Sequence, residues 1–175
     1  MQRLNVGCGT VQPAGWRNLD IVDHGQEFVV DVRGGLPFPD DFADYAVANH
    51  VLSDWTFHEL PGALSELYRV LKPGGVLRVL VPHFEEAIRA WQRHDRHWFP
   101  QGDDLEDVDE RFCTFVVWFG TVGSVFTPHY LYDLLHEAGF EKVCAVERGY
   151  TVYGVRGIND LDGDRTTSLI MEGRK

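Results

Sequence analysis

Two glycines near the start of the chain could bring main-chain N–H groups against a ligand. Gly7 and Gly9 follow directly on the short run Arg3–Val6, which reads as a strand. A buried strand that runs into a glycine turn leaves backbone N–H groups open, and no Cβ holds a ligand away from them. The pattern favours a nucleotide-like ligand, although a glycine pair after a strand is also typical of a plain tight turn.

Polar residues stand at the ends of the next strand-like runs. They are Asp20 in the run 17–21, Asp31 after the run 28–30, and Asn49 and His50 after the run 42–48. We expect them to meet in one crevice, because the carboxyl ends of neighbouring parallel strands lie at one edge of a sheet. The Asp20 carboxylate could accept from both hydroxyls of a ribose. A turn or helix-capping role for Asp20, and an Asx turn at Asp31, are the competing interpretations.

The elements that position these residues alternate between strands and helices. Strands are predicted at 3–6, 17–21, 28–30, 42–48, 76–81, 141–147 and 167–172, and helices at 57–71 and 128–138. The run 76–81 is almost continuously apolar, which is typical of a strand covered on both faces. Lys72, Pro73, Gly74 and Gly75 should close the first helix. The alternation predicts a parallel sheet with helices packed on it.

Five segments in this order resemble the small class I S-adenosylmethionine-dependent methyltransferases of the type 11 kind. They are Asn5–Gly9 (NVGCG), Leu36–Asp44 (LPFPDDFAD), Asn49–Leu52 (NHVL), Tyr68–Val79 (YRVLKPGGVLRV) and Phe126–Phe140. The resemblance covers nearly the whole chain. It implies an α/β, Rossmann-like fold with a mostly parallel seven-stranded sheet, an antiparallel last strand and helices on both faces. It also implies methyl transfer, with S-adenosylmethionine as the cofactor.

The same resemblance implies a set of cofactor-binding residues. These are Asn5, Gly7, Cys8, Gly9, Thr10, Asp20, Ile21, Asp31, Val32, Asn49, His50 and Leu52. Asp31 resembles the family's acidic contact to adenine, with Val32 covering the ring. His50 and Leu52 resemble the wall beside the reactive methyl group, and a structural histidine is the competing interpretation for His50.

The first glycine turn departs from the family pattern. Asn5 stands where an acidic residue is common, and Val11 stands where a third glycine is common. Asn5 can orient the turn but adds no charge to hold an ammonium group. Only ten residues separate Gly9 from Asp20, so we expect the first crossover helix to be shortened or lost. Weaker cofactor retention, or a site completed by a partner subunit, would follow. Some polysaccharide-locus and natural-product methyltransferases look similar in this respect.

Methyl transfer is an in-line displacement, so a base is needed only where the acceptor must lose a proton. For a hydroxyl acceptor a histidine would serve. His83 is the first candidate because it follows the strand 76–81, His50 is the second and His129 the third. His94 and His97 allow a metal-assisted alternative, but His-x-x-His without a third ligand is a weak signal, so no metal is predicted.

Residues 1–175 are expected to form a single domain, in which 83–127 is a lid or insertion that recognises the acceptor. This stretch interleaves aromatic residues, such as Trp91, Trp98 and Trp118, with acidic ones. The aromatic residues could form a lid or a dimer surface. A hydrophobic core helix at 112–119 and a solvated acidic loop are equally compatible with the pattern.

Composition excludes several classes of protein. The net charge of −11 argues against nucleic acid, which requires clustered Lys and Arg. The three cysteines are widely spaced, so neither a disulfide framework nor a zinc site is indicated. No apolar run is long enough to span a membrane, and no secretory leader is recognisable. We therefore expect a cytoplasmic protein with a small-molecule acceptor, no membrane or nucleic-acid partner, and a homodimer as a reasonable assembly.

Two other functions stay open at this point. A nicotinamide-dependent oxidoreductase also has a glycine turn and an acidic strand end, but its fingerprint has a third glycine and roughly 20 residues before the acid. A non-catalytic relative that uses the fold only for binding or as a scaffold is favoured slightly by Asn5 and the short first crossover.

Overall fold

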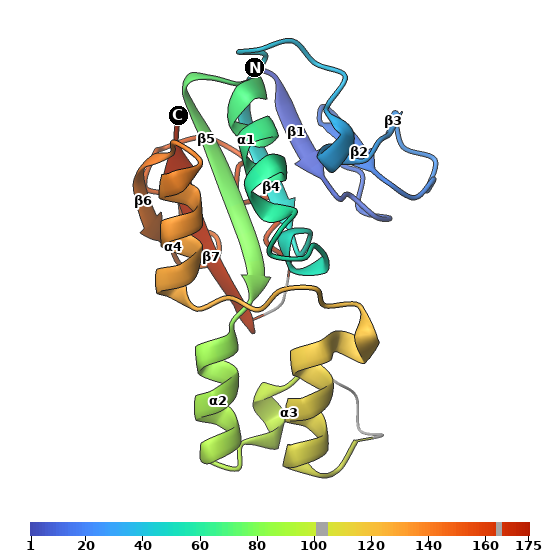
Figure 1. Cartoon of the computed structure of the whole chain (residues 1–175), viewed down its shortest axis with the longest axis vertical. Helices are drawn as coiled ribbons and strands as arrows, with labels where there is room; N and C mark the ends of the chain where they lie inside the picture. The colour runs from blue at the N-terminus through green and yellow to red at the C-terminus, as the bar shows by residue number, and fades with distance from the viewer. Residues whose placement is uncertain (101–104, 164–165) are drawn as a thin grey trace.

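One mixed sheet organises the molecule. The computed structural model describes residues 1–100, 105–163 and 166–175, and within them seven strands form a sheet in the order β3-β2-β1-β4-β5-β7-β6 (Figure 1). The strands are β1 (Arg3–Val6), β2 (Arg17–Asp20), β3 (Phe28–Val29), β4 (Ala43–Asn49), β5 (Leu71–Pro82), β6 (Glu141–Ala145) and β7 (Ser168–Arg174). Strand β7 is antiparallel to both of its neighbours, and the other pairs are parallel. The predicted Rossmann-like sheet with an antiparallel last strand is confirmed.

The first long helix and the strand after it differ slightly from the prediction. Helix α1 spans Leu60–Val70, with Pro61 in its first turn, where a missing N–H costs nothing. Residues 72–75 belong to β5 rather than to a loop, and the pairing of β4 with β5 shifts register between Ala43 and Tyr45. A Cβ at Gly75 would stand 2.8 Å from the Lys72 carbonyl oxygen, so this irregular stretch needs its glycine.

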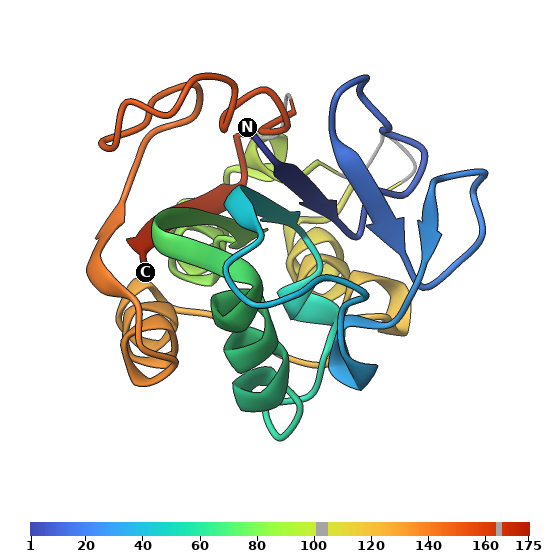
Figure 2. The same cartoon turned by 90° about the horizontal axis from the view of Figure 1, so that it is seen from above.

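Helices cover one face of the sheet. Helix α1 and helix α4 (Pro128–Glu137) lie side by side on it, as the view from above shows (Figure 2). Leu64 and Leu67 of α1 and Leu131 and Leu135 of α4 are buried in the same apolar cluster as the sheet residue Leu77. Burial of such side chains contributes about 1.5–3 kcal/mol each, so this layer is the main core of the protein.

The opposite face carries no helix within the described residues, which corrects the expectation of helices on both faces. The long connection between β6 and β7 covers it instead (Figure 2). Ile158 and Leu161 of this connection pack in one buried cluster with Tyr45, Val47 and the short link before β2. The physical reason is the one expected from the sequence: the links between β1, β2 and β3 are too short to hold a helix.

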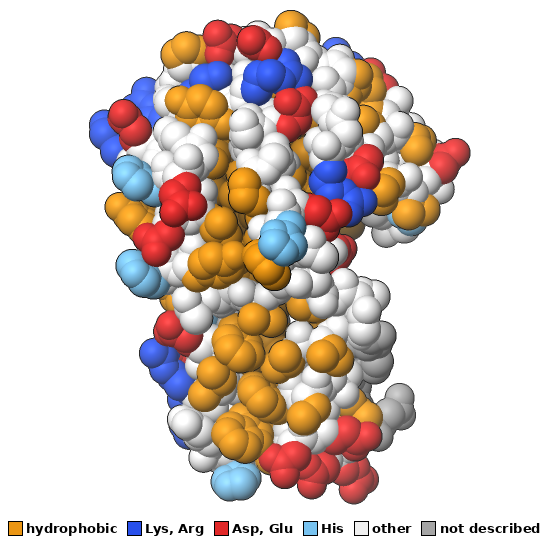
Figure 3. Space-filling model, in the orientation of Figure 1, with side chains coloured by type: hydrophobic (Ala, Val, Ile, Leu, Met, Phe, Trp, Pro, Cys, Tyr) orange, Lys and Arg blue, Asp and Glu red, His pale blue; other side chains and the backbone are white. Residues whose placement is uncertain are grey.

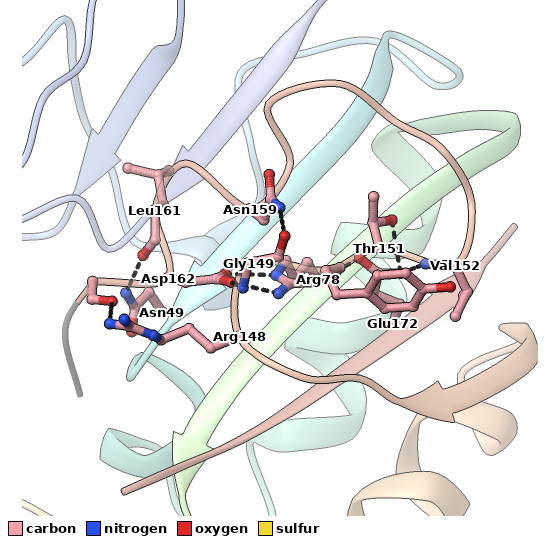
Figure 4. Close-up of polar contacts among 12 residues, drawn as sticks. Asn49, Arg78, Arg148, Gly149, Thr151, Val152, Asn159, Leu161, Asp162 and Glu172 are labelled. Atoms are coloured by element: carbon pink, nitrogen blue, oxygen red, sulfur yellow. Dashed lines mark hydrogen bonds and ion pairs between the residues drawn. The ribbon is translucent and has the colours of Figure 1, made fainter. Parts of the chain in front are cut away.

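Buried charges fasten this connection to the sheet (Figure 4). Arg78 of β5 is fully buried, and its guanidinium donates to both carboxylate oxygens of Asp162 at 2.7 and 2.6 Å. It also donates to Glu172 of β7 at 2.6 Å. Glu172 in turn accepts from the Val152 N–H at 3.1 Å, and Asp162 accepts from the Gly149 N–H at 2.7 Å. We call the segment 149–162, held in this way, the strap.

A second helical unit lies beyond the carboxyl end of β5 (Figure 1). It contains α2 (Phe84–Gln92) and α3 (Val108–Val117) and has a small apolar cluster of its own around Phe99 and Phe115. Short 3-10 turns at Val32–Gly34, Leu52–Asp54, Arg96–Trp98 and Trp118–Gly120 complete the described elements. Residues 101–104 of the predicted lid lie outside the described residues. Hydrophobic side chains gather on the face of this unit seen in Figure 3, with acidic ones at its end.

No helix in the described ranges combines the length and the apolar composition that crossing a membrane requires.

Candidate functional site

The glycine turn after β1 adopts a backbone that only glycine accommodates easily. Gly7 has φ +66° and Gly9 has φ +50°. A Cβ on Gly7 would stand 2.0 Å from Cγ2 of Val51, whereas one on Gly9 would meet nothing within 4 Å. A side chain at Gly7 is therefore disfavoured both by the backbone conformation and by the lack of space. At Gly9 it is disfavoured by the backbone conformation alone.

The side chain of Asn5 stabilises this turn by hydrogen bonds. Its side chain is buried, and its amide nitrogen donates to the Val11 carbonyl at 2.8 Å and to Asn18 Oδ1 at 2.9 Å. The amide thus ties the turn to the neighbouring strand β2, in keeping with an orienting role and without a charge.

Asp20 joins the glycine turn to the end of β2. Its Oδ2 accepts from the Gly9 N–H at 2.8 Å, and its Oδ1 accepts from the Val22 N–H at 2.9 Å. A carboxylate oxygen has lone pairs for more than one donor, so these backbone contacts leave acceptor capacity toward a ligand. The turn role and the ligand role of Asp20 are therefore compatible.

Asp31 makes the Asx turn that was its competing interpretation. Its Oδ1 accepts from the Arg33 N–H at 3.0 Å, and its carboxylate also pairs with the Arg33 guanidinium at 2.9 Å. Arg33 holds the pKa of this carboxyl below its usual range. Arg33 itself also reaches Glu59 at 2.6 Å, so the end of β3 is held by a small ion-pair network at the surface.

These residues surround a cavity at the point where the strand order reverses, between β1 and β4. We call it the strand-end cavity, and Gly7, Asp20, Asp31, Asn49 and His50 are part of its lining. Two further cavities adjoin it. The loop cavity lies between the glycine turn and the strap, and the α3 cavity lies between the end of β5 and helix α3. All three cavities share His50.

His50 is held in this junction by its backbone and by its ring. It has φ +57°. This backbone conformation is uncommon for a residue with a Cβ, and residues that adopt it are found often at functional sites. Its N–H donates to the Leu80 carbonyl at 2.8 Å, and its Nε2 lies 2.8 Å from Ser168 Oγ. The ring therefore has a fixed direction at the meeting point of the cavities.

The remaining predicted cofactor residues divide into two groups. Ile21 and Val32 line the strand-end cavity, and Cys8 lines the loop cavity beside Asn5. Thr10, Leu52 and Gly9 do not line the described cavities. Thr10 is exposed, and Leu52 is fully buried in the main core.

Of the three histidines considered as a base, only His50 lines a described cavity. Strand β5 continues through Pro82, so His83 becomes the N-cap of α2, and its Nδ1 accepts from the Glu86 N–H at 3.4 Å. Burial lowers the pKa of His83. His129 lies on α4 with a side chain 87% exposed, 3.5 Å from Asp133. The described residues also contain no group of three His, Cys, Asp or Glu able to hold a metal.

Asp54 is a site residue that the sequence reasoning missed. It lines both the strand-end cavity and the α3 cavity. Desolvation, and secondly the negative charge of Asp20, raise the pKa of its carboxyl. A carboxyl group with a raised pKa beside a cavity is a candidate proton acceptor. The available signal was its position four residues after His50, in the short segment that follows β4.

The chain is similar in sequence to known methyltransferases. Residues 18–79 match the family described as "Methyltransferase domain". The ubiquinone/menaquinone biosynthesis C-methyltransferase UbiE of Cronobacter sakazakii is 31% identical over 146 residues, which are 77% of this chain and 56% of that protein. The chain thus spans about half the length of the curated relatives it matches.

Solved structures with the same fold cover almost all of the chain. A SAM-dependent methyltransferase from Archaeoglobus fulgidus has a TM-score of 0.62 at 15% identity, over 99% of this chain and 86% of that one. Human N-acetylserotonin methyltransferase in complex with SAM has a TM-score of 0.58 at 18% identity, over 99% of this chain and 47% of that one. At such identities the likeness concerns the fold.

Proposed function

Since the chain belongs to the class I S-adenosylmethionine-dependent methyltransferases, we propose that it transfers a methyl group from S-adenosylmethionine to a hydroxyl of a small-molecule acceptor. The observation that carries the proposal is the strand-end cavity. A glycine turn that tolerates no Cβ at Gly7 and two carboxylates, Asp20 and Asp31, open onto it at the reversal of strand order. Nucleoside ligands bind at this place in open α/β sheets.

The residues present fit this ligand. Asp20 would accept from the ribose hydroxyls, and Asp31 from the adenine amine with Val32 against the ring. The loop cavity, next to Cys8 and the strap, would take the amino-acid end. The bound cofactor supplies a methyl group on a positively charged sulfur. The chain's own contribution is alignment at the junction around His50.

Asp54 is our candidate for the proton acceptor when the acceptor is a hydroxyl. It borders the cavity proposed for the cofactor and the one on the acceptor side, and its raised pKa makes its carboxylate a stronger base than an exposed aspartate. His50, fixed by Ser168, would form the wall beside the reacting atoms.

Asp54→Asn is expected to raise the free energy of unfolding at pH 7, with a gain that disappears as the pH is lowered to about 4. The folded state raises the pKa of Asp54, so it binds this proton more tightly than the unfolded state does. Stability is therefore lost as the pH rises through the unfolded pKa toward the folded one. Urea unfolding of both proteins at pH 4 and pH 7 measures the difference.

Turnover of Asp54→Asn should also fall about 100-fold or more, because the proton acceptor is lost. Equal stability of the two proteins at pH 7 together with unchanged turnover would contradict both the raised pKa of Asp54 and its role as proton acceptor.

Calorimetric titration with S-adenosylmethionine and S-adenosylhomocysteine, with NADH as the control, tests the proposed cofactor. Saturable binding of the two sulfur ligands and none of NADH is expected. Binding of NADH alone would favour an oxidoreductase. Binding of the sulfur ligands without transfer to any acceptor would favour the non-catalytic relative that the short first crossover leaves open.

Asp20→Ala is expected to lower the affinity for S-adenosylhomocysteine about 10- to 100-fold, since hydrogen bonds to a charged group contribute about 1.5–3 kcal/mol. The variant also loses the contact to the Gly9 N–H. Asp23→Ala is a matched control because Asp23 is exposed in the next turn and its Oδ1 accepts from the Gly25 N–H. Unchanged affinity in Asp20→Ala would show that the ribose lies elsewhere.

The acceptor atom has a second candidate. The matching relatives are C-methyltransferases by name, and the aromatic wall of the α3 cavity would suit a ring carbon as well as a ring hydroxyl. We place a natural-product hydroxyl first because Asp54 would have a proton to accept. A sugar hydroxyl is the alternative within this class.

A further inference from the structure

Asp54 carries a negative charge that no other residue in the described ranges balances. Within these ranges its carboxylate forms no hydrogen bond and no ion pair. The other two carboxylates that line the strand-end cavity are compensated, since Asp20 accepts from two backbone N–H groups and Asp31 pairs with Arg33. Desolvation already raises the pKa of Asp54, so its surroundings disfavour one negative charge and would disfavour a second still more.

The α3 cavity, which Asp54 lines, offers little positive charge to a bound molecule. Its volume is about 270 Å³, and its described lining contains no Lys or Arg. His50 is the one residue of this lining that could become cationic, and its Nε2 lies 2.8 Å from Ser168 Oγ. Arg111 of α3 donates to two backbone carbonyls and is not part of the lining. An anion in this cavity would therefore meet the charge of Asp54 without a strong counter-charge.

Another part of the lining of the α3 cavity is apolar. It includes Pro82, Phe115 and Val122. Phe115 is 3% exposed and is packed edge-on against Trp98 and Phe99, with ring centroids 5.2 and 5.8 Å away, so it is held in the core of the helical unit. A carboxylate or phosphate placed against such a wall loses hydration and gains no cation in return, which is costly.

We propose that the acceptor is an uncharged hydroxyl compound, and that Asp54 and the apolar wall together reject acceptors that carry a carboxylate or a phosphate. This inference rests on the proposed function and narrows its acceptor class. An anionic group of an acceptor has two kinds of place in the α3 cavity, and both are unfavourable. Near Asp54 it is repelled by a like charge, and against Phe115 it is desolvated without a counter-charge. An uncharged acceptor meets neither cost.

Titration of the protein saturated with S-adenosylhomocysteine tests the proposal. The probes are 4-hydroxybenzamide and 4-hydroxybenzoate, which share their shape and their hydroxyl and differ by one negative charge. An engineered cavity of about 150 Å³ binds benzene, so this larger cavity has room for one substituted ring. At about pH 8, where protonation of Asp54 is disfavoured, the amide should bind about tenfold or more tightly than the carboxylate.

Equal or tighter binding of 4-hydroxybenzoate would overturn the inference. Failure of both probes to bind would show that the α3 cavity does not take the acceptor and would overturn it as well. Because binding of S-adenosylhomocysteine is measured first, the absence of that binding would contradict the proposed function instead.

Asp54→Asn separates the local charge from the net charge of the protein. The preference for the amide should fall about threefold or more, chiefly through tighter binding of 4-hydroxybenzoate, because the like charge is removed while the apolar wall remains. Asp133→Asn makes the same change in net charge on α4, outside the lining of the three cavities, and should keep the preference. An unchanged preference in Asp54→Asn, or an equal fall in both variants, would show that Asp54 does not select the acceptor.

Discussion

Gly7→Ala is expected to weaken binding of S-adenosylmethionine about 100-fold or more. The new Cβ would lie 2.0 Å from Cγ2 of Val51, and the backbone at φ +66° disfavours any Cβ. Overpacking costs about 1–3 kcal/mol and the left-handed conformation about 1–2 kcal/mol. Their sum is about 2–5 kcal/mol, a range that includes the roughly 2.7 kcal/mol of a 100-fold change. Calorimetric titration measures the affinity, and a thermal melt reports how much of the cost reaches the free protein.

Two further variants divide this cost into its parts. Gly9→Ala meets no atom within 4 Å and carries only the conformational cost at φ +50°, so about a tenfold loss is expected. The double variant Gly7→Ala with Val51→Ala removes the steric contact and should recover part of the affinity. An equal loss in Gly7→Ala and Gly9→Ala would refute the steric explanation. Normal affinity in Gly7→Ala would show that the turn does not cradle the cofactor.

Local patterns predicted the parts of the fold that depend on neighbours in the chain. The sequence alone indicated the apolar run that forms β5, the leucine spacing that forms α1 and the short link before Asp20. The seven-stranded sheet with an antiparallel last strand came from the resemblance of several segments to one family. Gly7, Asp20 and His50 could be placed at one crevice because each follows a strand, and the ends of parallel strands share an edge.

The features that sequence reasoning missed depend on contacts between distant residues. Arg78 pairs with residues 84 and 94 positions away, so nothing near it indicated that a strap would replace the helices of one face. Asp54 acquires its raised pKa only from its folded surroundings. His83 was the first candidate base because it follows the strand 76–81, but its place at the start of α2 directs its Nδ1 toward the first turn of that helix.

Arg78→Met is expected to lower the free energy of unfolding by about 3–5 kcal/mol. The guanidinium is completely buried between Asp162 and Glu172, which are 4% and 0% exposed in their side chains. Its loss leaves two buried carboxylates without a cation, and desolvated charges of this kind are among the costliest defects in a protein interior. Urea unfolding measures the change. At this chain length the melting temperature should fall by about 10 °C.

The strap should respond to the same change more than the helical face does. Its segment 149–162 is attached to the sheet through these carboxylates and through Arg78, which also donates to the Tyr150 carbonyl at 3.0 Å. Hydrogen exchange should therefore accelerate in the strap of Arg78→Met while α1 keeps its protection. Because Leu161 and Asp162 line the loop cavity beside Cys8, affinity for S-adenosylmethionine should fall as well.

A matched variant tells charge apart from shape. Combining Arg78→Met with Asp162→Leu and Glu172→Leu removes all three charges, and replacing a complete buried ion cluster by apolar side chains is often neutral or stabilising. This triple variant should recover much of the stability that Arg78→Met loses, yet it should not recover the strap's contacts to the Gly149 and Val152 N–H groups. If Arg78→Met alone unfolds at the same urea concentration as the natural chain, the carboxylates find other partners. The strap is then held by Ile158 and Leu161 rather than by charge.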